Sequence, residues 1–424
     1  MWLPRGLVAA VLLAACSSKP APTPVPAPEK HAGSAQPIGA AAATATMLPK
    51  GNMVEGSVKP HREDPVVDCP VKLGENLDDE ARVAALLDEA NKQIEAGTFA
   101  AAWTCADRAA DLSPTSVEAN HLRGAALAAL GRDSEAATAY SLALALDPDD
   151  PETLRAVADF YINGKGERGR DALRLGLELA QRGSRRALAR RRRNAPLAAD
   201  LAVLEAQALN DLGRSDEALE RIDAALRIAP GRGDALHEKG VALFDLSRFA
   251  DAKAALQKAL GIQPEDAYTH QMLGLTLEQL ADPTAQSELE RAVKLAPSEL
   301  TLPVLISTAE FQKEIDVVIA GLAPERRARV KQIKVEIEDL PLAEDLKAVN
   351  PPFPPTILGL YRGPVGRAPA PADEPSSIVL YRKNLARAVK TRTELTEQIR
   401  DTLLHEIGHL EGLDEDDLRR RGME

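Results

Sequence analysis

Small and apolar residues recur along the middle of the chain at a nearly constant spacing. Prolines stand at positions 114, 148, 196, 230, 264 and 297, in steps of 34, 48, 34, 34 and 33 residues. Within these steps a small residue returns at the same place, as at Gly124, Ala206 and Gly240. Two helices that cross closely need small side chains at the crossing, and proline ends the second helix because it cannot continue one. The spacing predicts stacked helix pairs over residues 82–300.

This 34-residue period resembles that of tetratricopeptide repeats. The resemblance implies about six repeats, with turns between helices at LGR (130–132 and 212–214) and LSR (246–248). One repeat cannot cover its own apolar face, so neighbouring repeats stack into an α-solenoid. Such arrays present a groove for proteins or peptides, and the expected partner is therefore a protein or peptide bound by the repeats.

The 48-residue step contains a basic insertion, RGSRRALARRRRN, over residues 182–194. One interpretation is a patch for an anionic partner such as lipid phosphate or an acidic peptide. The other is a solvated extension of a helix, which we favour because runs of charge usually face water.

After Pro297 the 34-residue period stops and the pattern changes. Apolar residues at helical spacing, including Phe311, Ile315 and Val318, predict a helix near residues 309–322. Alternating apolar and polar residues then predict strands over 333–339, 356–362 and 377–383, and a helical pattern returns over 394–411. The fold class is therefore mostly α, with a repeat solenoid followed by a small α+β domain over residues 301–424.

The last predicted helix carries the sequence HEIGH, with His405, Glu406 and His409. Two histidines four residues apart project from one face of a helix and can hold a zinc ion at two corners of a tetrahedron. Glu406 is placed to take a proton from zinc-activated water and pass it to a leaving amine. Gly412 can end the helix in a left-handed cap and turn the chain back. The alternative is that both histidines are surface residues beside acids.

The stretch from about residue 309 to 422 resembles the bacterial minimal zincin-like metallopeptidases, relatives of the matrix-metalloprotease fold. It carries VEIEDLP, ILGLY, IVLYR and TLLHEIGHLEGL in that order. The resemblance implies Zn²⁺ as cofactor, His405 and His409 as ligands and Glu406 as the catalytic residue. The family pattern HExxHxxGxxD places Glu415 where aspartate is expected, so Glu415 is the first choice for the third ligand. Asp414 or Asp416 could replace it, or the protein could supply no third ligand.

The beginning of the chain changes the expected location. GLVAAVLLAA precedes Leu13-Ala14-Ala15-Cys16, which resembles a bacterial lipoprotein signal. The resemblance implies removal of residues 1–15, lipid on Cys16 and a membrane anchor; Ser17 favours the outer membrane of a Gram-negative cell envelope. An ordinary secretory signal is the alternative. The Pro- and Ala-rich residues 16–80 are expected to form a disordered tether.

Charge and cysteines refine these expectations. The net charge of −12 argues against nucleic acid as a partner. An exported compartment would permit a disulfide between Cys69 and Cys105, although we favour unpaired thiols, and neither cysteine has metal-ligand spacing.

Two functions follow from these features. The favoured one is a membrane-tethered zinc metallopeptidase whose repeats recruit the protein that it cleaves. The alternative is a non-catalytic envelope scaffold, in which the C-terminal domain holds a structural metal or none.

Overall fold

The computed structural model describes residues 67–74, 76–164, 169–189, 194–363 and 376–421, without the side chains of residues 415, 416 and 419. The predicted signal peptide, Cys16 and most of the predicted tether lie outside the described residues. None of the helices in the described ranges combines the length and the apolar character that a membrane span needs.

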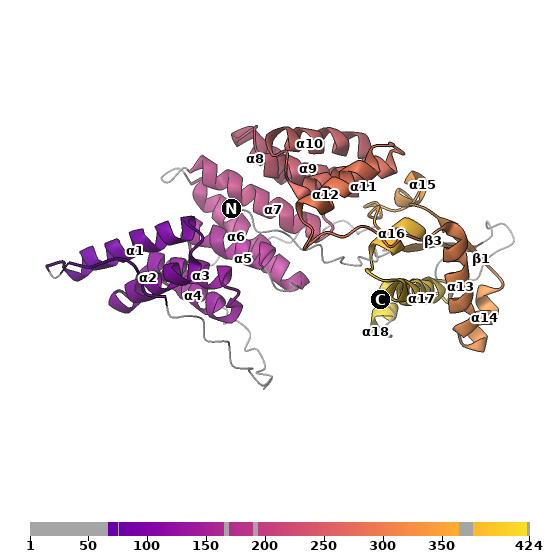
Figure 1. The fold of residues 1–424 in the computed structure, drawn as a ribbon, viewed down its shortest axis with the longest axis horizontal. Helices are drawn as coiled ribbons and strands as arrows, with labels where there is room; N and C mark the ends of the chain where they lie inside the picture. The colour runs from indigo at the N-terminus through magenta and orange to yellow at the C-terminus, as the bar shows by residue number, and fades with distance from the viewer. Residues whose placement is uncertain (1–66, 75, 165–168, 190–193, 364–375, 422–424) are drawn as a thin grey trace, which may run out of the picture. The chain divides into compact units, whose positions relative to one another are not determined.

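From Asp79 to Leu295 the described chain forms six helix pairs, coloured indigo to orange in Figure 1. The pairs are α1 (Asp79–Glu95) with α2 (Phe99–Leu112), α3 (Val117–Ala129) with α4 (Asp133–Leu146), α5 (Pro151–Asn163) with α6 (Arg170–Ala187), α7 (Ala195–Asp211) with α8 (Ser215–Ile228), α9 (Gly233–Asp245) with α10 (Phe249–Ile262), and α11 (Ala267–Gln279) with α12 (Ala285–Leu295). The predicted fold class, a mostly helical repeat solenoid, is confirmed.

The helix pairs cross where the sequence repeats a small residue. A methyl group added to Gly124 would lie 2.7 Å from the Tyr140 ring, and one added to Gly240 would lie 2.4 Å from Leu256. Protein interiors are packed too densely to absorb such overlaps without displacing the neighbouring side chain or its helix. The repeated small residues therefore mark sites where the two helices of a pair lie in close contact.

Turn chemistry also follows the repeat, with one exception. Gly131 and Gly213 have φ of 75°, and Ser247 has φ of 57°, so the LGR and LSR segments are left-handed turns. Five of the six prolines follow the end of a second helix. The prediction was wrong for Pro196, which lies in the first turn of α7, where a missing N–H costs nothing.

The basic insertion continues the helix that precedes it. α6 extends to Ala187, and two of its arginines pair with one carboxylate: Arg182 and Arg186 lie 2.8 and 2.5 Å from Asp149. These side chains are partly exposed, as expected for an extended helix end, and exposed ion pairs of this kind add little stability. Residues 190–193 lie outside the described residues.

The first helices of neighbouring repeats contact one another and share a recurring polar contact. Nδ1 of His121 lies 3.1 Å from the Thr153 hydroxyl oxygen, and Nδ1 of His237 lies 2.8 Å from that of Thr269. Burial, with a smaller effect of nearby Arg155, lowers the pKa of His121 to about 4. His121 is therefore neutral at physiological pH, and its ring links two repeats without a charge.

One carboxylate makes the stability of the array depend on pH. Burial raises the pKa of Asp245 to about 7, and Asp211 and Glu238 add to the rise, against a hydrogen bond from Ser215. Because the pKa is higher in the folded than in the unfolded chain, stability is lost as pH rises from about 4 through 7. We expect Asp245→Asn to raise the melting temperature more at pH 8 than at pH 5. The gain in the free energy of unfolding should be at most about 4 kcal/mol. The exposed Asp171→Asn is the control, and equal effects of Asp245→Asn at both pH values would contradict this account.

Cys69 and Cys105 form a disulfide, contrary to the favoured prediction of free thiols. Cys69 lies ahead of α1, and Val71 and Leu73 pack with it against the first helix pair. The predicted tether therefore extends too far, because residues 67–74 contact the first repeat. Apolar spacing alone gave no signal for this short irregular segment.

The disulfide should stabilise the first repeat. Its half-cystines are 36 residues apart, and closing a loop of this length is worth roughly 4 kcal/mol in the chain-entropy model. We expect Cys69→Ala to lower the melting temperature and to abolish its sensitivity to reductant. Identical melting of the wild type with and without reductant would show that the disulfide contributes nothing.

The C-terminal domain is a three-stranded sheet with helices. Its elements are α13 (Thr308–Gly321), α14 (Pro324–Val330), β1 (Lys334–Glu338), α15 (Ala343–Leu346), β2 (Gly359–Arg362), β3 (Ser377–Tyr381), α16 (Arg382–Arg387), α17 (Arg392–Leu410) and α18 (Glu415–Arg420). The strand order is β1-β3-β2, with β1 parallel and β2 antiparallel to β3. All three predicted strands are present, with shorter bounds.

The third strand was predicted two residues too long. Arg382 begins α16, where its guanidinium donates to Asp339 at 2.6 Å and to the carbonyl oxygen of Ile306 at 2.6 Å. In the same helix the buried Asn384 amide donates to the carbonyl oxygens of Pro355 and Ile357. These contacts with distant segments turn the chain into a helix at a point where the local pattern still alternates.

α17 packs against β2 and β3 and carries the site. It begins at the N-cap Thr391, whose hydroxyl accepts from the Glu394 N–H, while the Glu394 carboxylate accepts from the Lys390 N–H. Leu395, Ile399, Leu403 and Ile407 recur on one face and are fully buried in the domain core. Each such side chain contributes about 2–3 kcal/mol through burial. The core therefore holds α17 firmly against the sheet.

Candidate zinc and catalytic site

His405 and His409 converge at the C-terminal end of α17. Their Nε2 atoms lie 3.1 Å apart, and the His405 ring is 1% exposed. Two nitrogen ligands at 2.0–2.1 Å from one tetrahedral zinc ion would be separated by about 3.3 Å. The two imidazoles therefore fit two ligand positions of one zinc ion.

A backbone carbonyl orients the second imidazole. Nδ1 of His409 lies 3.0 Å from the carbonyl oxygen of Leu413, which can only accept, so Nδ1 carries the proton and Nε2 keeps its lone pair. The turn at Gly412, with φ of 82°, brings Leu413 back to the helix: the Gly412 N–H donates to the His409 carbonyl and the Leu413 N–H to the Gly408 carbonyl. The predicted left-handed cap at Gly412 is confirmed, and it fixes the ring orientation that a metal-binding His409 would need.

Glu406 lies between the helix and the sheet. Its side chain is 3% exposed, and a methyl group added to Gly359 of β2 would lie 3.1 Å from its Oε1. The carboxylate is therefore placed beside the first residue of the edge strand, one residue along α17 from His405.

The three acids predicted as candidates for a third ligand, Asp414, Glu415 and Asp416, lie at the start of α18. Asp414 Oδ1 accepts from the Asp417 N–H at 2.8 Å, so Asp414 is engaged as the N-cap of α18. The side chains of Glu415 and Asp416 lie outside the described residues. Among the side chains that the structure describes, no group of three His, Cys, Asp or Glu residues is arranged to hold a metal. Glu415 therefore stays a prediction.

Two other polar side chains near the strands have structural partners. The Tyr361 hydroxyl donates to the Ser376 hydroxyl at 3.2 Å, and Arg382 pairs with Asp339. These contacts place both side chains in the scaffold of the domain.

Sequence reasoning missed Gly359 and the Leu413 carbonyl. A glycine inside the apolar strand ILGLY is a general signal of close backbone approach, so Gly359 could have been noticed. The Leu413 contact uses only a main-chain atom, so no side-chain pattern announces it.

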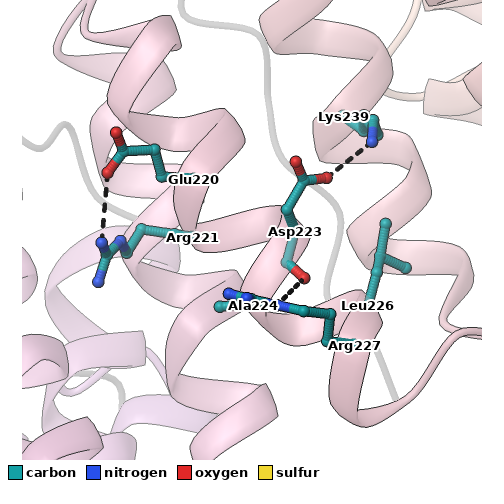
Figure 2. A pocket seen from close by; sticks show the side chains of 7 residues that line it. All are labelled: Glu220, Arg221, Asp223, Ala224, Leu226, Arg227 and Lys239. Atoms are coloured by element: carbon teal, nitrogen blue, oxygen red, sulfur yellow. Dashed lines mark hydrogen bonds and ion pairs between the residues drawn. The ribbon is translucent and has the colours of Figure 1, made fainter.

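A separate hollow of about 750 Å³ lies on the repeats, between α8 and α9 (Figure 2). It is lined by Glu220, Arg221, Asp223, Ala224, Leu226, Arg227 and Lys239. Its charges pair largely with one another: Arg221 lies 3.4 Å from Glu220, and Lys239 lies 2.7 Å from Asp223. None of the predicted site residues lines this hollow.

Comparison with known proteins assigns the parts of the chain. Residues 330–423 match a family described as zincin-like metallopeptidase, and residues 87–151 and 233–266 match tetratricopeptide repeat models. No curated protein in the comparison matches the chain.

Several solved structures resemble part of the chain. They include the protein of "Functional Characterization of Pseudomonas Aeruginosa pilF" (14% identity, 55% of this chain, 97% of that chain, TM-score 0.44). Another is PilW, titled a widely conserved type IV pilus biogenesis factor (15% identity, 51% of this chain, 94% of that chain, TM-score 0.44). A third is YrrB, titled a TPR protein with an unusual peptide-binding site (16% identity, 45% of this chain, 92% of that chain, TM-score 0.34). The helix pairs and the family matches together show tetratricopeptide repeats in this chain, followed by a C-terminal region, residues 330–423, that matches the zincin-like metallopeptidase family.

Proposed function

We propose that the chain is a membrane-tethered zinc metallopeptidase that hydrolyses peptide bonds in proteins recruited by its repeats. The observation that carries the proposal is the convergence of the His405 and His409 Nε2 atoms, 3.1 Å apart, beside the buried Glu406. His405, His409 and, as the third ligand, Glu415 would hold the zinc ion.

Glu406 and the residues that would hold zinc have different roles in the proposed hydrolysis. Bound zinc supplies a Lewis acid that polarises the scissile carbonyl and makes water more acidic. Glu406 accepts a proton from the attacking water, whose oxygen adds to the carbonyl carbon. Glu406 then donates that proton to the leaving amine as the C–N bond breaks. The Leu413 carbonyl holds His409 in the tautomer that this chemistry needs.

The remainder of the chain would supply recruitment and location. The first helices of successive repeats lie side by side, which provides a continuous face for a protein or peptide partner. The Cys69–Cys105 disulfide suits an oxidising compartment. Lipid on Cys16 would hold the protein at the cell envelope, in the outer membrane of a Gram-negative bacterium.

Hydrolysis of a fluorescence-quenched peptide library tests this function. We expect cleavage by the purified wild type, loss of cleavage after zinc removal with 1,10-phenanthroline and recovery on adding zinc. Wild type that binds zinc but cleaves neither the library nor an unfolded protein would contradict the peptidase and favour the scaffold.

A further inference from the structure

The edge strand and α17 lie in close contact at Gly359. Gly359 begins β2 and pairs with Leu380 of β3. A methyl group added to Gly359 would lie 2.7 Å from Cγ2 of Thr402, 3.1 Å from Oε1 of Glu406 and 3.2 Å from the Val379 carbonyl oxygen. Contacts shorter than 3.0 Å essentially never occur at real Cβ atoms, so any other residue here would have to displace the Thr402 side chain or α17 itself.

Thr402 is the residue on α17 that fills this contact. It is 4% exposed and lies one helical turn before Glu406, so both side chains project from the same face toward β2. The branched methyl group of Thr402 therefore determines how near the helix can lie to the strand. That distance in turn determines where the Glu406 carboxylate lies relative to the backbone of β2.

The two histidines depend on this contact much less. His405 and His409 belong to the same helix, and the contact that orients His409 comes from Leu413, beyond the end of α17. If α17 shifts away from β2, the two imidazoles move together and keep their mutual geometry. The carboxylate of Glu406, in contrast, loses its position beside the strand.

We propose that Gly359 and Thr402 are positioning residues that set the Glu406 carboxylate for catalysis by fixing the spacing between β2 and α17. This inference rests on the proposed peptidase function. It separates metal binding, which depends on α17 and its C-terminal turn, from catalysis, which also depends on the helix–strand contact.

Gly359→Ala in the full-length protein tests the inference. We expect kcat on the quenched peptide library to fall by about 100-fold, since a displacement of about 1 Å has an effect of this size. KM and zinc stoichiometry should stay near wild type. The metal-free variant should melt roughly 5 °C lower, because the added methyl group overpacks the contact.

A rescue variant separates positioning from general damage. Serine keeps the hydroxyl of threonine but lacks Cγ2, so Thr402→Ser removes the atom that the new methyl group would meet. We expect Gly359→Ala with Thr402→Ser to regain most of the lost kcat and melting temperature. Gly321→Ala is the matched control, because a methyl group added there has no neighbour within 4 Å.

Three outcomes decide the matter. Full kcat in Gly359→Ala would overturn the inference while leaving the peptidase intact. Loss of kcat without any rescue by Thr402→Ser would also overturn it, since the Thr402 methyl group would then not be the limiting contact. An inactive wild type would overturn the proposed function and this inference together, whatever the melting temperatures.

Discussion

Glu406→Gln is expected to lower hydrolysis by roughly 10²–10⁴-fold while leaving zinc bound. Glutamine has the same size as glutamate, so it should fill the buried space beside Gly359 without moving α17. It cannot accept a proton from water at neutral pH, and it has no proton to return to the leaving amine. The loss should appear in kcat and kcat/KM together, because the interaction belongs to the transition state.

The control for this variant comes from the same helix. Glu397 lies on α17 but is exposed to solvent, so Glu397→Gln removes an equal charge away from the core. We expect Glu397→Gln to hydrolyse the peptide library at the wild-type rate. Unchanged hydrolysis in Glu406→Gln would show that another group acts as the base, and the mechanism proposed above would be abandoned.

The second large effect concerns the third ligand. We expect Glu415→Gln to weaken zinc binding by more than about 100-fold, because loss of an outer-shell partner alone costs about 10–100-fold. Asp414→Asn is a close control: asparagine caps helices as well as aspartate does, so the contact with the Asp417 N–H can persist while the charge is removed. Competition with a zinc chelator would measure both affinities.

The same titration ranks the three neighbouring acids. Asp416→Asn completes the series, and little change is expected from it. A larger loss in Asp414→Asn or Asp416→Asn than in Glu415→Gln would move the ligand to that residue. Three unchanged affinities would leave the two histidines as the only protein ligands among the predicted residues.

Periodic features of the fold were readable from the sequence. Each helix pair needs a small residue where its helices cross and a left-handed turn between them. These requirements recur with the repeat, as at Gly124 and Gly240 for the crossings and at Gly131 and Gly213 for the turns. The departure at Pro196 arises where the insertion interrupts the period. Proline is compatible with either end of a helix, so its position alone could not say which end it marks.

Contacts between distant segments could not be predicted from the sequence. Cys69 and Cys105 pair across 36 residues, and Arg382 leaves its predicted strand for partners at Asp339 and Ile306. No local sequence pattern predicts these contacts between distant residues. The histidine pair was predictable because a single helix brings its members together.

The placement of Glu406 combines both cases. The helical pattern of the sequence predicts that Glu406 follows His405 on the same helix. The contact between Glu406 and Gly359 depends instead on how α17 packs on the sheet. The sequence could thus propose the residues of the site and their roles. The spacing between α17 and β2, which places Glu406 beside Gly359, could be seen only in the tertiary structure.

The most direct measurement of the central claim is the metal content of the purified chain from residue 17 onward, determined by mass spectrometry after dialysis against metal-free buffer. The convergent Nε2 atoms of His405 and His409 predict about one zinc ion per chain. They also predict loss of that ion in His405→Ala and in His409→Ala. A wild-type chain that takes up no zinc even after zinc is added would contradict the account.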